Sequence, residues 1–377
     1  MSRVTIKQDG GYIKMRATRN DVAKLAGVGA STVSYVLSGK KKFSPEVESK
    51  VWKAVKQLNY YPNYNAKQMK AKHGQNICYI SEVSINLDHS DIVCGMESVA
   101  VKRGDWLNVK PFVTMEMLSE ITADLISRKV DGAVLVYLPE HIDPTVVQRL
   151  LDNNIKVLMT IPYYPTDQRI SQVKIDYMEA MEKIVAYLHE FGHREIGFLD
   201  LFRKDYIYDT RLRGFQSAIL KYGLGGHVVN LEECGGKNAE DGSRELDRIL
   251  SLGISAVAHQ TETDRLTEIL REGIGRLLQE GVTAIAFPND TTAFIGVNIL
   301  KEMGLSVPED ISATAVNDTF LCEISNPRLT TLKCDYFALG AEMANTLYNY
   351  IDNDICENKK FSLPLVTRDS VAKVKVD

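Results

Sequence analysis

The chain has 377 residues, of which 45% are hydrophobic and 25% charged, values typical of a soluble globular protein with two or three domains. No stretch reaches the ~20 apolar residues that a membrane-spanning helix needs, and the N-terminus lacks an apolar signal core, so we expect a cytoplasmic protein. The six cysteines are scattered without metal-ligand spacing, which predicts reduced thiols and argues against a CxxC zinc site.

The net charge of the chain is divided between two parts of opposite sign. Residues 1–73 carry 15 Lys and Arg against 4 Asp and Glu, whereas the remaining residues carry 30 against 45. A small basic part on a large acidic body predicts that the first part alone binds an anionic polymer. A basic face that only meets water is the alternative until a motif decides between them.

Residues 1–14 precede the first helical pattern as an N-terminal extension. Apolar and polar residues alternate around Asp9-Gly10, which predicts a β-hairpin. Because a lone two-stranded hairpin is only marginally stable in water, we assign this extension no function.

Residues 15–61 show the pattern of three short helices. Thr18 and Asp21 have the spacing of a capping box, Gly27 stops the first helix, and the apolar face of this helix is expected to comprise Val22, Ala23, Leu25 and Ala26. A second helix is predicted from residue 30 to 37, and a third begins where Pro45 follows the cap residue Ser44. Two short helices joined by a glycine turn and braced by a third are typical of a helix-turn-helix, whose second helix enters the DNA major groove. A generic three-helix bundle would show the same pattern.

From residue 76 onward, short apolar strands alternate with helical stretches. Candidate strands lie at 76–83, 106–113, 131–138 and 156–161, and a second series runs through 172–176, 195–201, 226–231, 284–290 and 312–318. This alternation predicts an α/β fold with two doubly wound parallel sheets, which bind ligands at the carboxyl ends of their strands. No glycine-rich phosphate loop follows a strand, and His193 is expected to be a turn residue rather than a zinc ligand.

The segments "DVAKLAGVGASTVSYVLSG", "SPEVESKVWKAVKQLNYYPN" and "NAKQM" resemble the head and hinge of the LacI/GalR family of bacterial transcriptional regulators. The segments "FPNDTTAFIGVNILKEMGLSVPEDISATAVNDT" and "LPLVTRDS" extend the resemblance, in family order, over nearly the whole chain. It implies a helix-turn-helix head at 15–61, a hinge helix or linker at 62–75, and at 76–377 a two-lobed effector-binding and dimerisation core like periplasmic sugar-binding proteins. The expected N-lobe comprises about 76–173 and 305–335, and the C-lobe about 174–304 and 336–377.

The resemblance also implies which residues of the head and hinge contact DNA. Base edges are expected to meet the second helix, phosphates the flanking polar residues, and the minor groove an apolar wedge from the hinge. Two departures, Gly29 in place of a serine cap and Tyr35 in place of an arginine, mean that the operator sequence does not carry over. The expected contact residues are Thr18, Ala30, Ser31, Thr32, Ser34, Tyr35, Asn63, Ala66, Lys67 and Met69, with Met69 as the wedge.

For the effector, the resemblance points to polar side chains at strand ends of the core. The loop "SINLDHSD" lacks the aromatic residue that many members carry after the first core strand, and Thr160 stands where an aspartate is usual. Polar acceptors and amides in these positions favour a carbohydrate over a purine. The candidate effector-binding residues are Glu82, Asn86, Asp88, Thr160, Arg211, Asn289, Asn317 and Tyr336.

These patterns predict a homodimeric repressor that binds a near-palindromic double-stranded DNA operator under control of a sugar-like effector, without a membrane partner, cofactor or metal. The first alternative is a regulator of the same fold that a partner protein controls, a phosphocarrier corepressor, with a non-functional cleft. A solute-binding protein or a hydrolase is the second alternative. It is disfavoured because the first 73 residues form a DNA-binding head and no nucleophile–base pair has supporting spacing, so we expect no enzyme.

Overall fold

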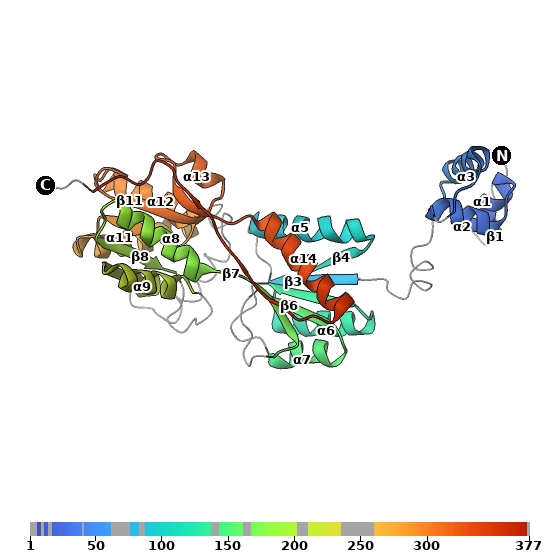
Figure 1. The fold of residues 1–377 in the computed structure, drawn as a ribbon, viewed down its shortest axis with the longest axis horizontal. Helices are drawn as coiled ribbons and strands as arrows, with labels where there is room; N and C mark the ends of the chain where they lie inside the picture. Colours follow the sequence, from blue (N-terminus) through green and yellow to red (C-terminus); the bar gives the residue numbers. More distant parts are fainter. Residues whose placement is uncertain are drawn as a thin grey trace. The chain divides into compact units, whose positions relative to one another are not determined.

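A computed structural model describes residues 6–8, 11–13, 17–39, 41–61, 76–82, 87–136, 143–160, 167–201, 210–234 and 260–374. The chain divides into two compact units, Met1–Gly74 and Gln75–Asp377. The first unit is a small helical head and the second is an α/β core (Figure 1). Within the described residues, every helix is too short or too polar to cross a bilayer.

The head contains the predicted hairpin and the predicted three helices. Its strands pair antiparallel, with Ile6 opposite Ile13, which confirms the hairpin. Thr18 and Asp21 cap each other, with the Thr18 N–H 2.8 Å from the Asp21 carboxylate, and Gly27 ends the helix with a φ of 67°. The elements are β1 (Ile6–Gln8), β2 (Gly11–Ile13), α1 (Arg19–Ala26), α2 (Ala30–Ser38) and α3 (Pro45–Leu58).

The core of the head is small and draws on all three helices. Val22, Val33 and Val51 are fully buried, one from each helix. Leu25, which the helical pattern placed on the inner face, is exposed instead. Because α2 and α3 cover only one side of the eight-residue helix α1, its apolar residues outside that narrow stripe face solvent.

The first core sheet has six parallel strands in the order β13-β7-β6-β5-β3-β4. Its central strand β5 is buried along its whole length, as expected where helices cover both faces. The strands are β3 (Asn76–Glu82), β4 (Trp106–Phe112), β5 (Gly132–Val136), β6 (Lys156–Met159), β7 (Ile170–Ile175) and β13 (Asn358–Phe361). The accompanying helices are α5 (Leu87–Arg103), α6 (Met115–Ser127), α7 (Pro144–Asp152) and α14 (Tyr336–Asn353).

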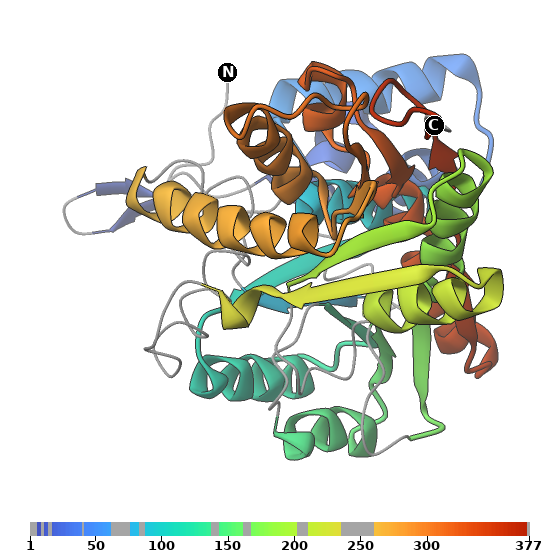
Figure 2. The same cartoon turned by 90° about the vertical axis from the view of Figure 1, so that its left-hand side faces the viewer.

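The second core sheet has the order β14-β12-β11-β10-β8-β9, with only β14 antiparallel. Helices α8 and α9 lie side by side on one of its faces, in green and yellow-green in Figure 2, and α11 packs on the other. The strands are β8 (Glu195–Asp200), β9 (Gly225–Asn230), β10 (Ala284–Ala286), β11 (Ser312–Asn317), β12 (Thr330–Lys333) and β14 (Leu365–Val366). The helices are α8 (Tyr177–Glu190), α9 (Arg211–Tyr222), η1 (Leu231–Glu233), α11 (Gln260–Gln279), α12 (Asp290–Glu302) and α13 (Phe320–Ile324).

Strand pairing corrects the expected distribution of the chain between the lobes. Residues 305–335 were expected in the N-lobe, but β11 and β12 extend the second sheet from β10. Conversely, α14 packs on α5 and β13 joins β7, so most of residues 336–361 belong with the first sheet. In the order of the described strands, the chain therefore passes between the sheets three times: after β7, after β12 and after β13. A buried parallel strand can extend either sheet, and only its tertiary partner decides which.

Helices α5 and α14 approach each other closely through two glycines. A Cβ at Gly340 would lie 2.1 Å from the Ile92 carbonyl oxygen, and one at Gly95 would lie 2.0 Å from the Phe337 carbonyl oxygen. Both obstacles are backbone atoms, so a side chain could be accommodated only if the helices moved apart. These two glycines therefore set the distance between α14 and α5.

We expect Gly340→Ala to lower the free energy of unfolding by at least about 2 kcal/mol, because the overpacking exceeds the gain in helix propensity. The matched control is Gly275→Ala in α11, where an added Cβ meets nothing within 4 Å. That change should be neutral or stabilising by up to ~1 kcal/mol. Urea unfolding of the full chain measures both, and equal midpoints for the two variants would contradict the close approach.

Candidate functional site

The outer face of α2 presents the side chains expected to read bases. Ser31 and Tyr35 lie one helical turn apart and are exposed, whereas Val33 and Val36 on the opposite face are buried. Ala30 is partly buried against the core of the head, and Thr32 is half-buried. The helix therefore offers a narrow exposed strip, with Tyr35 as its largest side chain.

Arg19 belongs to the same surface, although sequence reasoning did not select it. Its Nη1 donates a hydrogen bond to Ser34 Oγ over 3.0 Å and so joins the first turn of α1 to α2. Thr18 caps α1 beside it and is exposed. A cation near a helix N-terminus opposes the helix dipole, so an anion nearby would stabilise it. The only sign in the sequence that Arg19 belongs to this surface is that it directly follows the cap residue Thr18.

The remaining DNA-contact predictions, Asn63, Ala66, Lys67 and Met69, lie outside the described residues, as does the whole hinge at 62–75.

The carboxyl edge of the second sheet brings together three of the predicted effector residues. Arg211 begins α9, and its guanidinium donates to the Pro288 carbonyl over 3.2 Å and to the Tyr177 hydroxyl over 2.9 Å. The guanidinium also lies 4.2 Å from the centre of the Tyr177 ring. Arg211 is thereby fixed next to Asn289, the residue after Pro288.

Asn289 and Asn317 lie at the carboxyl ends of adjacent parallel strands, at the same level. Ala286 pairs with Thr314, so each asparagine comes three residues after that pair. The side-chain oxygen of Asn289 accepts from the Thr292 N–H over 2.9 Å and caps α12, which leaves its amide N–H groups to donate. Within the described residues, the side-chain oxygen of Asn317 is buried without a hydrogen-bond donor.

The other residues predicted to bind the effector lie away from this edge, or their side chains fall outside the described residues. Thr160 directly follows β6 of the first sheet, and its hydroxyl has no hydrogen-bond partner in the described part of the chain. Tyr336 opens α14, is 8% exposed and packs in the main apolar cluster. Glu82 ends β3 and Asp88 lies in α5, but their side chains, like all of Asn86, fall outside the described residues.

Two further groups at this edge were missed by sequence reasoning. Tyr177 is the ring on which Arg211 stacks, and Asp200 pairs in register with Asn230 at the ends of β8 and β9. The Asn230 amide donates to the Asp200 carboxylate over 3.1 Å, and both residues are buried. Asp200 was missed because it lies inside the strand predicted at 195–201, where no sequence signal marks it as the strand end.

His193 occupies a structural position. It is 2% exposed, and its Nδ1 lies 2.8 Å from Thr283 Oγ1. Burial lowers the pKa of its imidazole to about 4, so the ring is neutral at pH 7. Among the described residues, no cluster of three His, Cys, Asp or Glu side chains could hold a metal ion.

Two family models match the chain. The model of bacterial regulatory proteins of the lacI family matches residues 18–63, and the model of a periplasmic binding protein-like domain matches residues 185–371. The first covers the helices of the head, and the second covers all six described strands of the second sheet together with α14 and β13.

The curated relatives and solved structures agree with these models. The HTH-type transcriptional repressor PurR of Vibrio vulnificus is 26% identical over 362 residues, covering 95% of this chain and 99% of the relative. The Lac repressor dimer bound to operator and the anti-inducer ONPF has the same fold, with a TM-score of 0.71 at 21% identity over 95% of this chain and 100% of that one. A complex of the transcriptional regulator CelR with cellobiose has a TM-score of 0.61 at 22% identity, over 94% and 100% of the two chains. With a helix-turn-helix head, a periplasmic-binding-protein-like core and relatives that match end to end, this chain belongs to the lacI family of bacterial transcriptional regulators.

Proposed function

We propose that the protein is a repressor that binds a near-palindromic operator as a homodimer, and that a sugar-like effector at the carboxyl strand ends of the core controls its affinity for DNA. The observation that carries the DNA-binding part is the exposed strip of α2, flanked by Arg19 and Thr18 at the start of α1. The two kinds of residue suit two kinds of contact, because base edges specify a sequence whereas phosphates only orient the protein.

Tyr35 and Ser31 supply hydroxyl groups for base edges in the major groove, and the Tyr35 ring adds apolar surface for a thymine methyl. Arg19, already held by Ser34, is placed for a phosphate, and an anion there would also offset the charge it adds at the helix N-terminus. Thr18, Thr32 and Asn63 complete the proposed phosphate contacts. The described head is basic as well, since Lys24, Lys50, Lys53 and Lys56 are all exposed.

For the hinge at 62–75, the proposal rests on sequence alone. A helix of about two turns is unstable by itself in water, so we propose that it forms on DNA with a second subunit. Ala66 and Lys67 then approach the backbone, and Met69 enters the minor groove as an apolar wedge. We also propose that residues 15–61 form the DNA-binding domain and that residues 76–377 form the effector-binding core.

The proposed dimer is supported by an apolar surface on the outer edge of the first sheet. β4 is an edge strand, and its Trp106 and Val109 are exposed together with the neighbouring Val113. Val101 on α5, which packs beside β4, is exposed as well. An exposed edge strand with several large apolar residues is unusual for a monomer and typical of a protein interface.

The effector proposal rests on the polarity of the carboxyl edge. Arg211 offers a rigid fork of N–H donors, Asn289 offers amide donors, and the buried oxygen of Asn317 is an acceptor. Such a mixture of donors and acceptors fits hydroxyl groups, which both donate and accept. Thr160 and Tyr336, with the "SINLDHSD" residues Glu82, Asn86 and Asp88, remain proposed contributors. The cellobiose bound by the CelR structure agrees with a carbohydrate.

Tyr35→Ala should weaken operator binding by about tenfold or more, because one good base contact is worth about 1–3 kcal/mol. Duplexes enriched from a random pool at ~100 mM salt provide the operator, and fluorescence anisotropy measures affinity. Trp52→Ala is the control, since Trp52 is an equally exposed aromatic residue on α3. If both variants bind like the wild type, α2 does not read the bases; equal losses would indicate damage to the head instead.

Trp106→Glu combined with Val109→Glu should convert a dimer into a monomer, because two carboxylates would be buried in an apolar interface. Sedimentation velocity at micromolar concentration measures the mass. Leu220→Glu, which changes an 82% exposed leucine on α9, should leave the dimer intact. A wild type that sediments as a monomer would refute the dimer.

At least one of cellobiose, glucose and ribose should raise the melting temperature of the wild type, because a ligand of the native state stabilises it by mass action. Arg211→Lys should weaken binding of that sugar by tenfold or more, since lysine lacks the forked donors. Arg213→Lys, an exposed change on the same helix, is the control. A rise in melting temperature with adenine or guanine, and none with a sugar, would contradict the proposal that the effector is a carbohydrate.

A further inference from the structure

The end of β11 has an unfavourable backbone conformation. Asn317 has a φ of 113° and Asp318 a φ of 63°, and neither residue is glycine. Two successive residues in the left-handed half of φ space persist only where the surroundings hold them. Asn317 is also the residue whose buried side-chain oxygen is proposed to accept from the effector.

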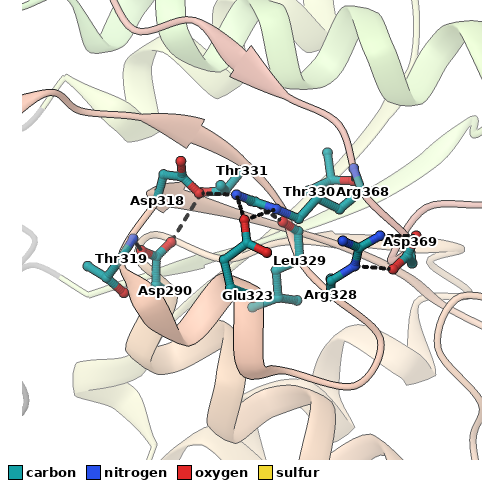
Figure 3. A network of polar contacts seen from close by, with 10 residues as sticks. All are labelled: Asp290, Asp318, Thr319, Glu323, Arg328, Leu329, Thr330, Thr331, Arg368 and Asp369. Carbon is teal, nitrogen blue, oxygen red and sulfur yellow. Dashed lines mark hydrogen bonds and ion pairs between the residues drawn. The ribbon is translucent and has the colours of Figure 1, made fainter.

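Asp318 is held by an arginine from the distant C-terminal segment. Arg368 Nη2 lies 2.7 Å from Asp318 Oδ1, and both side chains are only 9% exposed (Figure 3). The segment that carries Arg368 follows β14 and is itself fixed, because the Ser370 hydroxyl donates to the Ala313 carbonyl over 2.6 Å. The anchor of the turn is therefore rigid.

Arg368 has further partners besides Asp318. Its Nη1 donates to the Leu329 carbonyl over 2.9 Å, and both Nη2 and Nε reach the Glu323 carboxylate, at 2.7 and 3.1 Å. Its backbone N–H donates to Thr330 Oγ1 over 2.9 Å. A planar guanidinium with this many partners is held in one orientation, and a lysine could not make the same set of contacts.

Asp290 holds the turn from the other side. Its carboxylate accepts from the Thr319 N–H at 2.5 Å and from the Thr331 hydroxyl at 3.1 Å. The Asn317 carbonyl accepts from the Cys334 N–H over 3.0 Å. The Asn317 backbone and the two residues after it are thus fixed through backbone or ionic contacts, while the Asn317 side-chain oxygen takes no part in the network.

We propose that Arg368 is a positioning residue for effector binding: through its ion pair with Asp318 it holds the strained 317–319 turn, so that the Asn317 side chain is presented to the ligand. Arg368 does not contact the effector itself and acts only through Asn317. The inference rests on the proposed function, because it needs an effector at the carboxyl edge of the second sheet.

Hydrogen exchange tests the clamp without any ligand. In Arg368→Gln, exchange of the Thr319 and Cys334 amides should accelerate by at least tenfold, since both N–H groups bond within or to the turn. The control Arg328→Gln removes the adjacent arginine, which pairs with Asp369 at 2.8 Å in an exposed position, and should leave these amides unchanged. Unchanged exchange in Arg368→Gln would overturn the proposal. Should this variant not fold, Asp318→Asn, which tolerates a positive φ, is measured in its place.

Titration calorimetry with whichever of cellobiose, glucose or ribose stabilises the wild type tests the positioning role. Arg368→Gln should lower the affinity at least tenfold in the wild-type background but less than twofold in an Asn317→Ala background. A purely structural role would accelerate exchange and lower the melting temperature with the affinity unchanged, and that result would overturn the proposal. A wild type that binds none of these sugars refutes the proposed effector and the positioning role with it, whereas the exchange data still decide whether Arg368 clamps the turn.

Discussion

Parallel strand pairing in the second core sheet is the constraint on which the candidate effector site depends. β8, β10 and β11 run side by side in one direction, so the residues that follow them arrive at a common edge. Asn289 and Asn317 are far apart in the chain and reach the same level of this edge because of this register, and Arg211 lies beside Asn289 through its hydrogen bond to the Pro288 carbonyl. In the first sheet, Thr160 directly follows β6 in the same manner, and the order of the described strands joins the two sheets through three crossings.

At this edge, the side chains that fix the backbone differ from the side chains that are proposed to bind a ligand. Asp290 accepts hydrogen bonds from Thr319 and Thr331, and Asp318 forms an ion pair with Arg368, at the turn between β11 and α13. Burial raises the pKa of the Asp290 carboxyl to about 6, despite hydrogen bonds that lower it, so its ionised form is costly and its donors are needed. Among the described residues, no donor reaches the buried side-chain oxygen of Asn317 beside this network, which agrees with the proposal that a hydroxyl group of the effector supplies one.

In the head, by contrast, the local sequence determines most of the structure. Caps and glycines set the limits of α1, α2 and α3 within about one residue of the expected positions, since these signals act over four residues. Sequence reasoning failed there only where tertiary packing decided: Leu25 faces solvent because neither neighbouring helix reaches it, and Arg19 matters because α2 places Ser34 within its reach.

The sequence by itself determined the alternation of strands and helices, the helix-turn-helix and the two opposite charges of the chain, because periodicity, capping and composition are local properties. It also named Arg211, Asn289 and Asn317 through a family resemblance. Tertiary structure alone decided which sheet takes β11, β12 and β13, where Tyr177 stacks, and that Arg368 reaches Asp318 across 50 residues of chain. Such contacts join segments whose local patterns are independent of one another, so no local signal in either segment could reveal them.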